Sequence, residues 1–387
     1  MNRDIAIVGV GLSRMGELWE QPLRDLFVSA ALKAMDDAGV DAVDALYVGS
    51  MSSGLFTGQE HLAALLADYL GATPIPALRV EAGETSGALA IQAAILDVAS
   101  GNSEVVLAGG VEKMNDVPGE AVARILMTSA DAEYEGYQGF THPALFALMA
   151  RAHMERYGTT REQIAQVAVK NHAHGARNRG AAQLGFPITV EAVLGSPLVA
   201  EPLRMLDCAP VTDGAAAVIV CSMEAAKRFT NHPVIRVKGF GQATDAIALH
   251  DRKELTGLEA VAVAAHKAYA MAGITPAQVD VAEVHDATTI AEIMALEALG
   301  LVENGRGGPA TEAGETAHGG RIPVNTSGGA KSFGNPLGAM GVAQAVEIVT
   351  QLRGAAGDRQ VENARVGLVQ TLGGCGASAS VQLLEVV

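Results

Sequence analysis

The chain repeats one strand–helix pattern in its two halves, and this repeat restricts the possible folds more than any other feature. Residues 30–40 read AALKAMDDAGV and precede the strand-like run DALYV, whereas residues 264–274 read AAHKAYAMAGI and precede DVAEV. Residues 78–110 and 324–371 form a second matching pair, each with a turn, a small-residue helix and a strand. The repeat is too long for a solenoid. It predicts an α/β protein of two βαβα halves, stacked about a pseudo-twofold axis as a five-layered α/β/α/β/α sandwich.

Each half contains a turn that leads directly into a helix of small residues. In the first half, Glu84 lies in a tight turn before a helix expected over residues 88–100. In the second half, Asn335 precedes a helix expected over residues 337–352. Free N–H groups and the dipole favour negative charge at a helix N-terminus, and many enzymes place a nucleophile there. Because the repeat makes Glu84 and Asn335 topological equivalents, we expect both to face one pocket.

Composition argues against several classes of protein. The 387 residues are 49% hydrophobic and include 44 glycines, which suits close helix packing in a large core. The net charge of −16 argues against a nucleic-acid partner, although local basic groups can still bind an anionic small molecule. None of the three cysteines has the C-x-x-C spacing of a zinc or redox site. With no signal-peptide core and no membrane-length apolar run, we expect a protein of the reducing cytoplasm, without membrane contact.

A polar, irregular region interrupts the first half. It begins near residue 113, contains two helices expected over residues 143–157 and 160–174, and ends in Gly-, Pro- and Arg-containing segments. The run DGAAAVIV at residues 213–220 then returns to a buried strand. We therefore predict an N-terminal half (1–112), an inserted loop domain (113–210), the end of the N-terminal half (211–232) and a C-terminal half (233–387). Loop regions of this kind often carry substrate contacts.

Seven short motifs resemble those of one family, in the same order and along nearly the whole chain. They are GGVEKM at 109–114, VAVKNH at 167–172, VTDGAAA at 211–217, EVHDA at 283–287, VNTSGG at 324–329, GNPLGA at 334–339 and GGCGA at 373–377. On these motifs the chain resembles the thiolase superfamily, in particular the sterol-carrier-protein-type and archaeal acetoacetyl-CoA thiolases. The resemblance implies the thiolase fold and a reaction on acyl-CoA thioesters.

The resemblance also implies which residues form the active site. Such thiolases have a nucleophilic Cys where this chain has Glu84, and the His that activates it where this chain has Asn335. The two other catalytic positions of the family are present as His285 and Cys375. Contacts with CoA are expected from Lys170, Arg177, Ser327, Gly328 and Gly374.

Replacement of the Cys changes the expected chemistry, because a carboxylate cannot form the acyl-thioester intermediate of thiolysis. By resemblance, His285 with an ordered water or Asn335 would donate hydrogen bonds to a thioester oxygen, and one such donor contributes roughly 3–4 kcal/mol. Cys375 would move a proton at the carbon next to the thioester. Glu84 would act as a base in aldol or retro-aldol cleavage of a β-hydroxyacyl-CoA, or hold water or a carboxylate-bearing substrate. The leading hypothesis is an acyltransferase, thiolase or aldol-type enzyme that makes or breaks a carbon–carbon bond through an enolate.

Two other interpretations remain open. Glu84 can be an inert helix-capping residue in a catalytically silent subunit that serves assembly with a partner protein. Ordinary thiolysis would instead require Cys375 as the nucleophile. An open pocket shared by the four candidate catalytic residues would favour the enzyme over the silent subunit.

The resemblance also predicts the partners of the chain. It implies a homodimer and complexes in which a small zinc-ribbon/OB-fold protein completes the CoA site. Coenzyme A enters as part of the substrate or product, and we expect no cofactor or metal bound by the chain itself. His172 and His174 are interpreted as polar surface at a helix end, and Cys208 and Cys221 as core residues.

Overall fold

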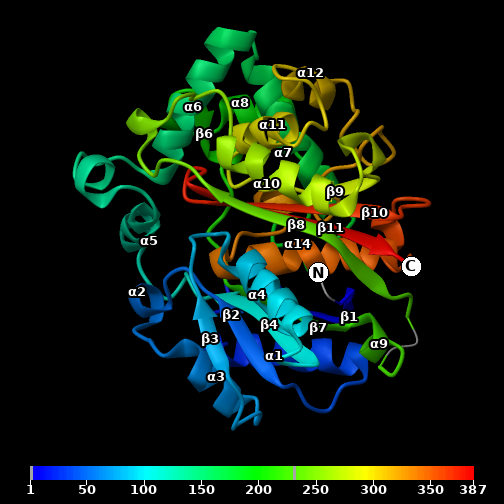
Figure 1. The fold of residues 1–387 in the computed structure, drawn as a ribbon. Helices are drawn as coiled ribbons and strands as arrows, with labels where there is room; N and C mark the ends of the chain where they lie inside the picture. Colours follow the sequence, from blue (N-terminus) through cyan, green and yellow to red (C-terminus); the bar gives the residue numbers. More distant parts are fainter. Residues whose placement is uncertain (1–2, 230–231) are drawn as a thin grey trace.

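The computed structural model describes residues 3–229 and 232–387, which fold around one mixed sheet (Figure 1). Within this part of the chain the sheet has nine strands in the order β3-β2-β4-β7-β1-β8-β11-β10-β9. The strands are β1 (Ile5–Leu12), β2 (Ala45–Gly49), β3 (Ala77–Val80), β4 (Val105–Glu112), β7 (Gly214–Ser222), β8 (Ile235–Thr244), β9 (Val281–Glu283), β10 (Val366–Gly373) and β11 (Ser378–Val386). Strands β1 and β8 pair over a short antiparallel register at Ala6 and Ile7, and this contact joins the two halves of the sheet.

The two halves of the sheet have the same internal order. The first half runs β3-β2-β4-β7-β1, and the second runs β9-β10-β11-β8, with Val324 bridged in parallel to Ala282 in the place equivalent to β3. Side chains repeat as well. Asp44 accepts two backbone N–H bonds at the start of β4, and Asp280 accepts the same two bonds at the start of β10. The duplication predicted from the sequence is therefore present in the sheet and in its side-chain contacts.

Helices cover both halves of the sheet and fill the space between them. Helix α1 (Leu23–Ala38) packs on the outer face of the first half beside α3 (Leu62–Tyr69), and α10 (Glu259–Ala272) packs on the outer face of the second half. Helices α4 (Ser86–Ser100) and α14 (Leu337–Leu352) contact each other and lie between the two halves, as Figure 1 shows for the orange α14. This arrangement gives the predicted five layers.

Small residues let the two central helices approach closely. A Cβ atom on Gly87 of α4 would lie 2.3 Å from the carbonyl oxygen of Gly338 in α14. A Cβ atom on Gly341 would lie 2.8 Å from the backbone nitrogen of Ala88. Any larger residue at these positions would push the helices apart, so the glycines determine how the turns in front of both helices meet.

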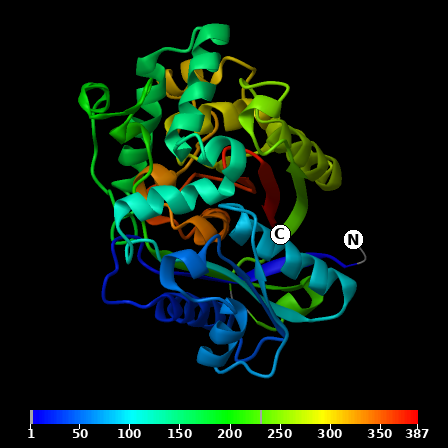
Figure 2. The ribbon, with the colours of Figure 1, turned by 90° about the vertical axis from the view of Figure 1, so that its left-hand side faces the viewer.

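The inserted region leaves the sheet after β4 and returns at β7. It contains α5 (Gly119–Leu126), α6 (His142–Tyr157), α7 (Arg161–Gly175), α8 (Val190–Gly195), β5 (Leu198–Ala200) and β6 (Leu203–Arg204). Its helix α7 packs against α11 (Thr289–Ala298), α12 (Gly307–Glu312) and α13 (Gly329–Ser332) of the second half. Figure 2 shows the teal and green insertion beside the orange helix α14. A short helix, α2 (Ser53–Thr57), and α9 (Met223–Ala226) complete the α-helices of the described residues. None of these helices is long and apolar enough to cross a membrane.

Candidate active site

Glu84 and Asn335 line one small cavity of about 70 Å³. Glu84 lies in the turn between β3 and α4, and Asn335 lies in the equivalent turn before α14. The other residues around the cavity are Met114, Leu126, His142, Pro143, Cys208, Ala209, Pro210, Val211, Ala287, Thr288 and Leu337. Since one water takes about 30 Å³ of liquid volume, the space suits a few small atoms, such as a short acyl group. The predicted convergence of the two turns on one pocket agrees with this geometry.

The Glu84 carboxylate is buried, and one of its oxygens has no hydrogen bond. The side chain is 1% exposed. Its Oε2 accepts the backbone N–H of Gly374 at 2.8 Å. Its Oε1 lies 3.4 Å from Nε2 of His142 and accepts no hydrogen bond among the described residues. A carboxylate fixed through one oxygen leaves the other available to a ligand in the cavity.

His142 is a site residue that the sequence analysis missed. It begins helix α6 in the inserted region, with Pro143 beside it in the first turn, and its ring packs edge-on against Phe146. Its Nε2 is buried, lies 3.4 Å from Oε1 of Glu84 and forms no hydrogen bond within the described part of the chain. The His-Pro pair at a helix start within a polar, irregular stretch is the only local signal, and local patterns do not reveal that this helix end meets Glu84.

Cys375 lies next to the residue that holds Glu84. Its thiol is 3% exposed and donates a weak hydrogen bond to the carbonyl oxygen of His142 at 3.8 Å. Burial raises the pKa of the Cys375 thiol well above its ordinary value, and the nearby Glu84 carboxylate raises it further. The thiol therefore keeps its proton at neutral pH, which suits a proton donor.

His285 is held as a neutral imidazole. It follows β9, is 1% exposed, and its backbone N–H donates to Oε1 of Gln370 at 3.0 Å. Burial lowers the pKa of His285 to about 3, with a smaller contribution from His142. A neutral imidazole can donate an N–H to a developing oxyanion without carrying charge into the protein interior.

His285 and Cys375 do not line the small cavity, but each interacts with His142, which does. Five buried polar atoms of this region have no hydrogen-bond partner among the described residues. They are Oε1 of Glu84, Nε2 of His142, Nε2 of His285, Oγ1 of Thr288 and Oδ1 of Asn335. An unsatisfied buried polar atom costs about 1–3 kcal/mol, so a cluster of them indicates a site prepared for a polar ligand.

The structure places four of the predicted CoA contacts away from this cavity. The Lys170 ammonium is buried 2.9 Å from Oε1 of Glu292, so its charge is already paired in the interior. The CoA contact of Lys170 stays a prediction. Arg177 is exposed. The Ser327 hydroxyl donates to the buried carboxylate of Glu283 at 2.6 Å.

Two glycines from the same prediction differ in their surroundings. A Cβ atom on Gly328 would meet the backbone of Gly175 in α7 at 2.8 Å, so Gly328 belongs to the packing of α13 against the insertion. Gly374 does belong to the site, because its N–H holds Glu84. Its φ of +57° also places it in the left-handed region, which glycine adopts without strain.

The interpretation of His172 and His174 as polar surface is wrong. Both are buried, and both accept or donate hydrogen bonds within the protein. Burial lowers the pKa of His172 to about 4 and that of His174 to about 3. Within residues 3–229 and 232–387, no three His, Cys, Asp or Glu side chains cluster closely enough to hold a metal ion. Cys208, predicted as core, is half-buried and lines the cavity, whereas Cys221 is buried.

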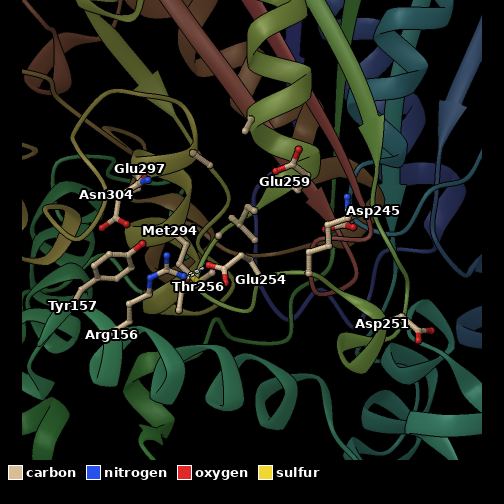
Figure 3. Close-up of a pocket in the computed structure, with 15 residues that line it drawn as sticks. Arg156, Tyr157, Asp245, Asp251, Glu254, Thr256, Glu259, Met294, Glu297 and Asn304 are labelled. Carbon is tan, nitrogen blue, oxygen red and sulfur yellow. Dashed lines mark hydrogen bonds and ion pairs between the residues drawn. The ribbon is translucent and has the colours of Figure 1, made fainter.

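A separate, larger cavity of about 490 Å³ lies at the C-terminal end of α6 (Figure 3). The C-terminal turn of α6, with Arg156 and Tyr157, forms one wall, and Glu254, Thr256 and the start of α10 form another. None of the four candidate catalytic residues lines it. Of the four, Glu84 and Asn335 line the smaller cavity.

Two family models match nearly the whole chain. The thiolase N-terminal domain matches residues 5–224, and the thiolase C-terminal domain-like family matches residues 241–386. The chain belongs to the thiolase family. An acetyl-CoA acetyltransferase of Methanothermobacter thermautotrophicus is 51% identical to it, over 99% of this chain and 100% of the relative. Human sterol carrier protein 2 is 33% identical, over 97% of this chain and 71% of that protein.

A solved structure adds an aldolase to these thiolase relatives. The Ltp2-ChsH2(DUF35) aldolase shares 27% sequence identity with this chain, with a TM-score of 0.85, over 99% of this chain and 98% of the other. The thiolase fold and the family predicted from the motifs are thereby confirmed. The relatives are named as acetyl-transferring and carbon–carbon bond enzymes, which supports an acyl-CoA enzyme of this superfamily.

Proposed function

We propose that this thiolase-family chain makes or breaks a carbon–carbon bond next to an acyl-CoA thioester by an aldol-type reaction, with Glu84 as the base. One observation carries the proposal. The residue at the family's nucleophile position is a buried carboxylate with a free oxygen in the cavity, and the Gly374 N–H holds its other oxygen. A carboxylate in this geometry can accept a proton from a hydroxyl group, whereas it cannot carry a stable acyl group.

In the cleavage direction, Glu84 takes the proton of the β-hydroxyl group of a β-hydroxyacyl-CoA. The oxygen forms a carbonyl, the bond between the α and β carbons breaks, and its electron pair passes to the thioester as an enolate. The neutral His285 and the Asn335 amide donate hydrogen bonds to the enolate oxygen. Cys375 then gives its proton to the α carbon, and the proton on Glu84 returns to the Cys375 thiolate through solvent.

The surroundings of Cys375 support this assignment. The pKa of its thiol is raised by burial and by the negative charge of Glu84, so it carries a proton when the enolate forms. In the reverse direction the thiolate removes an α proton from the acyl-CoA. This step predicts that the protein exchanges the α protons of acetyl-CoA with heavy water, even without a second substrate.

Two parts of the proposal concern assembly. The homodimer is proposed from the resemblance to thiolases alone. The small zinc-ribbon/OB-fold partner is also a proposal, and the similar aldolase, whose name includes a DUF35 protein, supports it. Coenzyme A is proposed as the carrier of the substrate, in line with the acetyl-CoA acetyltransferase relatives. The protein should therefore be purified with any small subunit that accompanies it before activity is measured.

The test compares Glu84→Gln with Cys375→Ala on acetyl-CoA and on β-hydroxyacyl-CoA esters, with products followed by mass spectrometry. Glu84→Gln keeps an acceptor for the Gly374 N–H, so the site should stay folded. We expect it to reduce cleavage by about 10²–10⁴-fold and to retain α-proton exchange. Cys375→Ala should lose both. Binding of the esters without exchange or cleavage by the parent protein would favour the catalytically silent subunit and refute the proposal.

A further inference from the structure

Arg252 lies buried in the segment that connects β8 to α10, although it is not part of the cavity. The residue is 8% exposed. Its Nη1 donates to the carbonyl oxygen of Cys375 at 2.7 Å, and its Nε donates to the carbonyl oxygen of Ala246 at 3.0 Å. Burying a guanidinium group costs free energy unless its N–H groups find partners, and here two of them bind backbone carbonyl oxygens. Burial lowers the pKa of Arg252, and the nearby carboxylates of Asp245 and Glu135 partly oppose this shift.

The turn that carries Cys375 joins β10 to β11, and the N–H groups of Gly376 and Ala377 donate to the carbonyl oxygen of Gly373 at 3.2 and 3.1 Å. It is bordered by Gly374 and Gly376, whose φ angles of +57° and +103° lie in the left-handed region. Glycines are the most flexible residues, and fixing them costs conformational entropy. The segment from β8 to α10 holds the turn from outside through Arg252 and through the Asp245 N–H, which donates to the carbonyl oxygen of Ala377 at 2.9 Å.

Two groups of the proposed site depend on this turn. The Gly374 N–H holds Glu84, and the Cys375 thiol lies one residue further on. The positive charge of Arg252 partly opposes the rise that burial and the carboxylates of Glu84 and Glu135 cause in the pKa of Cys375. Arg252 therefore acts on both the position and the charge of the reacting groups without contacting the cavity.

We propose that Arg252 is a positioning residue of the Gly374–Cys375 turn, and that through this turn it fixes the placement of Glu84 and of the Cys375 thiol. The proposal rests on the role of Cys375 in proton transfer given above. It adds a residue that neither the family motifs nor the cavity includes, and it ties the outer segment at residues 245–258 to the reaction.

The experiment compares Arg252→Gln and Arg252→Lys with the control Arg156→Gln. Arg156 suits the control because it also binds this segment, through Glu254 and through the Thr256 hydroxyl at 3.0 Å, but it is half exposed and has no contact with Cys375 (Figure 3). Activity is measured as exchange of the α protons of acetyl-CoA in heavy water over a range of pH. Amide hydrogen exchange of Gly374 and Cys375 is measured on the same proteins.

We expect Arg252→Gln to lower kcat for exchange by about 100-fold, because displacement of a reacting group by about 1 Å has that effect. KM for acetyl-CoA should change by less than about threefold, since Arg252 does not line the cavity. The pH of half-maximal exchange should move upward, because the positive charge of Arg252 is lost. Arg252→Lys should keep this pH near the parent value, and Arg156→Gln should match the parent in every respect.

The amide measurement separates this proposal from the proposed function. Faster exchange of the Gly374 amide in Arg252→Gln than in Arg156→Gln supports the positioning role, even if the parent protein shows no turnover. Unchanged amide protection, or a kcat within about threefold of the parent in folded Arg252→Gln, overturns it. A parent protein without α-proton exchange would refute the proposed function but leave the amide comparison to decide the role of Arg252.

Discussion

Changing Glu84 to Cys together with Asn335 to His tests whether this one pair of residues determines the reaction. Both residues line the same cavity and occupy equivalent turns before the two central helices. A cysteine at position 84 would lie two residues before the first residue of α4, where free N–H groups and the helix dipole lower a thiol pKa. A histidine at position 335 would supply the base that this thiol needs.

The expected magnitudes follow from the contacts of Glu84. Loss of the carboxylate leaves the buried Gly374 N–H without an acceptor, which costs about 1–3 kcal/mol. A domain of ordinary stability, about 5–15 kcal/mol, tolerates this loss. The general base should then raise thiolysis of acetoacetyl-CoA in the double variant by about 10²–10⁴-fold over Glu84→Cys alone. Asn335→His alone should show no thiolysis, because the nucleophile is absent.

The assay follows the loss of acetoacetyl-CoA in the presence of free CoA, with mass spectrometry to detect an acetyl group on residue 84. Circular dichroism and size-exclusion chromatography establish that each variant is folded. The reasoning would be refuted by a folded double variant that shows neither thiolysis nor acetylation. It would also fail if Glu84→Cys alone were as fast as the double variant, since the two changes would then act independently.

Two further predictions concern buried charge. Lys331 is 1% exposed, and burial lowers the pKa of its ammonium group, although nearby Cys208, Asp286 and Asp207 partly oppose this shift. Lys331→Met should therefore raise the free energy of unfolding by about 1–3 kcal/mol at neutral pH. The folded state binds the proton of the Lys331 ammonium group less tightly than the unfolded state does. The stability gained by Lys331→Met should therefore shrink as pH rises toward 10.5. Urea titrations at two pH values measure this gain. Equal or lower stability would contradict the prediction. Burial also lowers the pKa of His172 to about 4 and of His174 to about 3, from 6.5. The contribution of the two neutral imidazoles to the free energy of unfolding is then fully present above pH 6.5 and is lost as pH falls toward 3. His174→Gln should weaken this pH dependence, measured as urea midpoints from pH 7 to 4. An unchanged slope would show that other groups cause the acid sensitivity.

The sequence alone predicted the duplication, the layered fold and the meeting of Glu84 with Asn335. These features follow from the repeat and from hydrophobic periodicity, whereas the thiolase family was predicted from the resemblance of the seven motifs. Once the repeat fixes the topology of each half, equivalent turns must lie at equivalent places. The symmetric bonds of Asp44 and Asp280 show how completely the second half repeats the first.

The structure alone decided the contacts between the insertion and the core. Helix α7 packs against α11, α12 and α13, and this packing buries Lys170 and His174, which the sequence pattern placed at the surface. His142 and Arg252 reach the site from segments far from it in sequence. A local pattern shows that a helix has a polar face but not which distant segment covers that face. Only the tertiary contacts therefore bring His142 to Glu84 and Arg252 to the turn of Cys375.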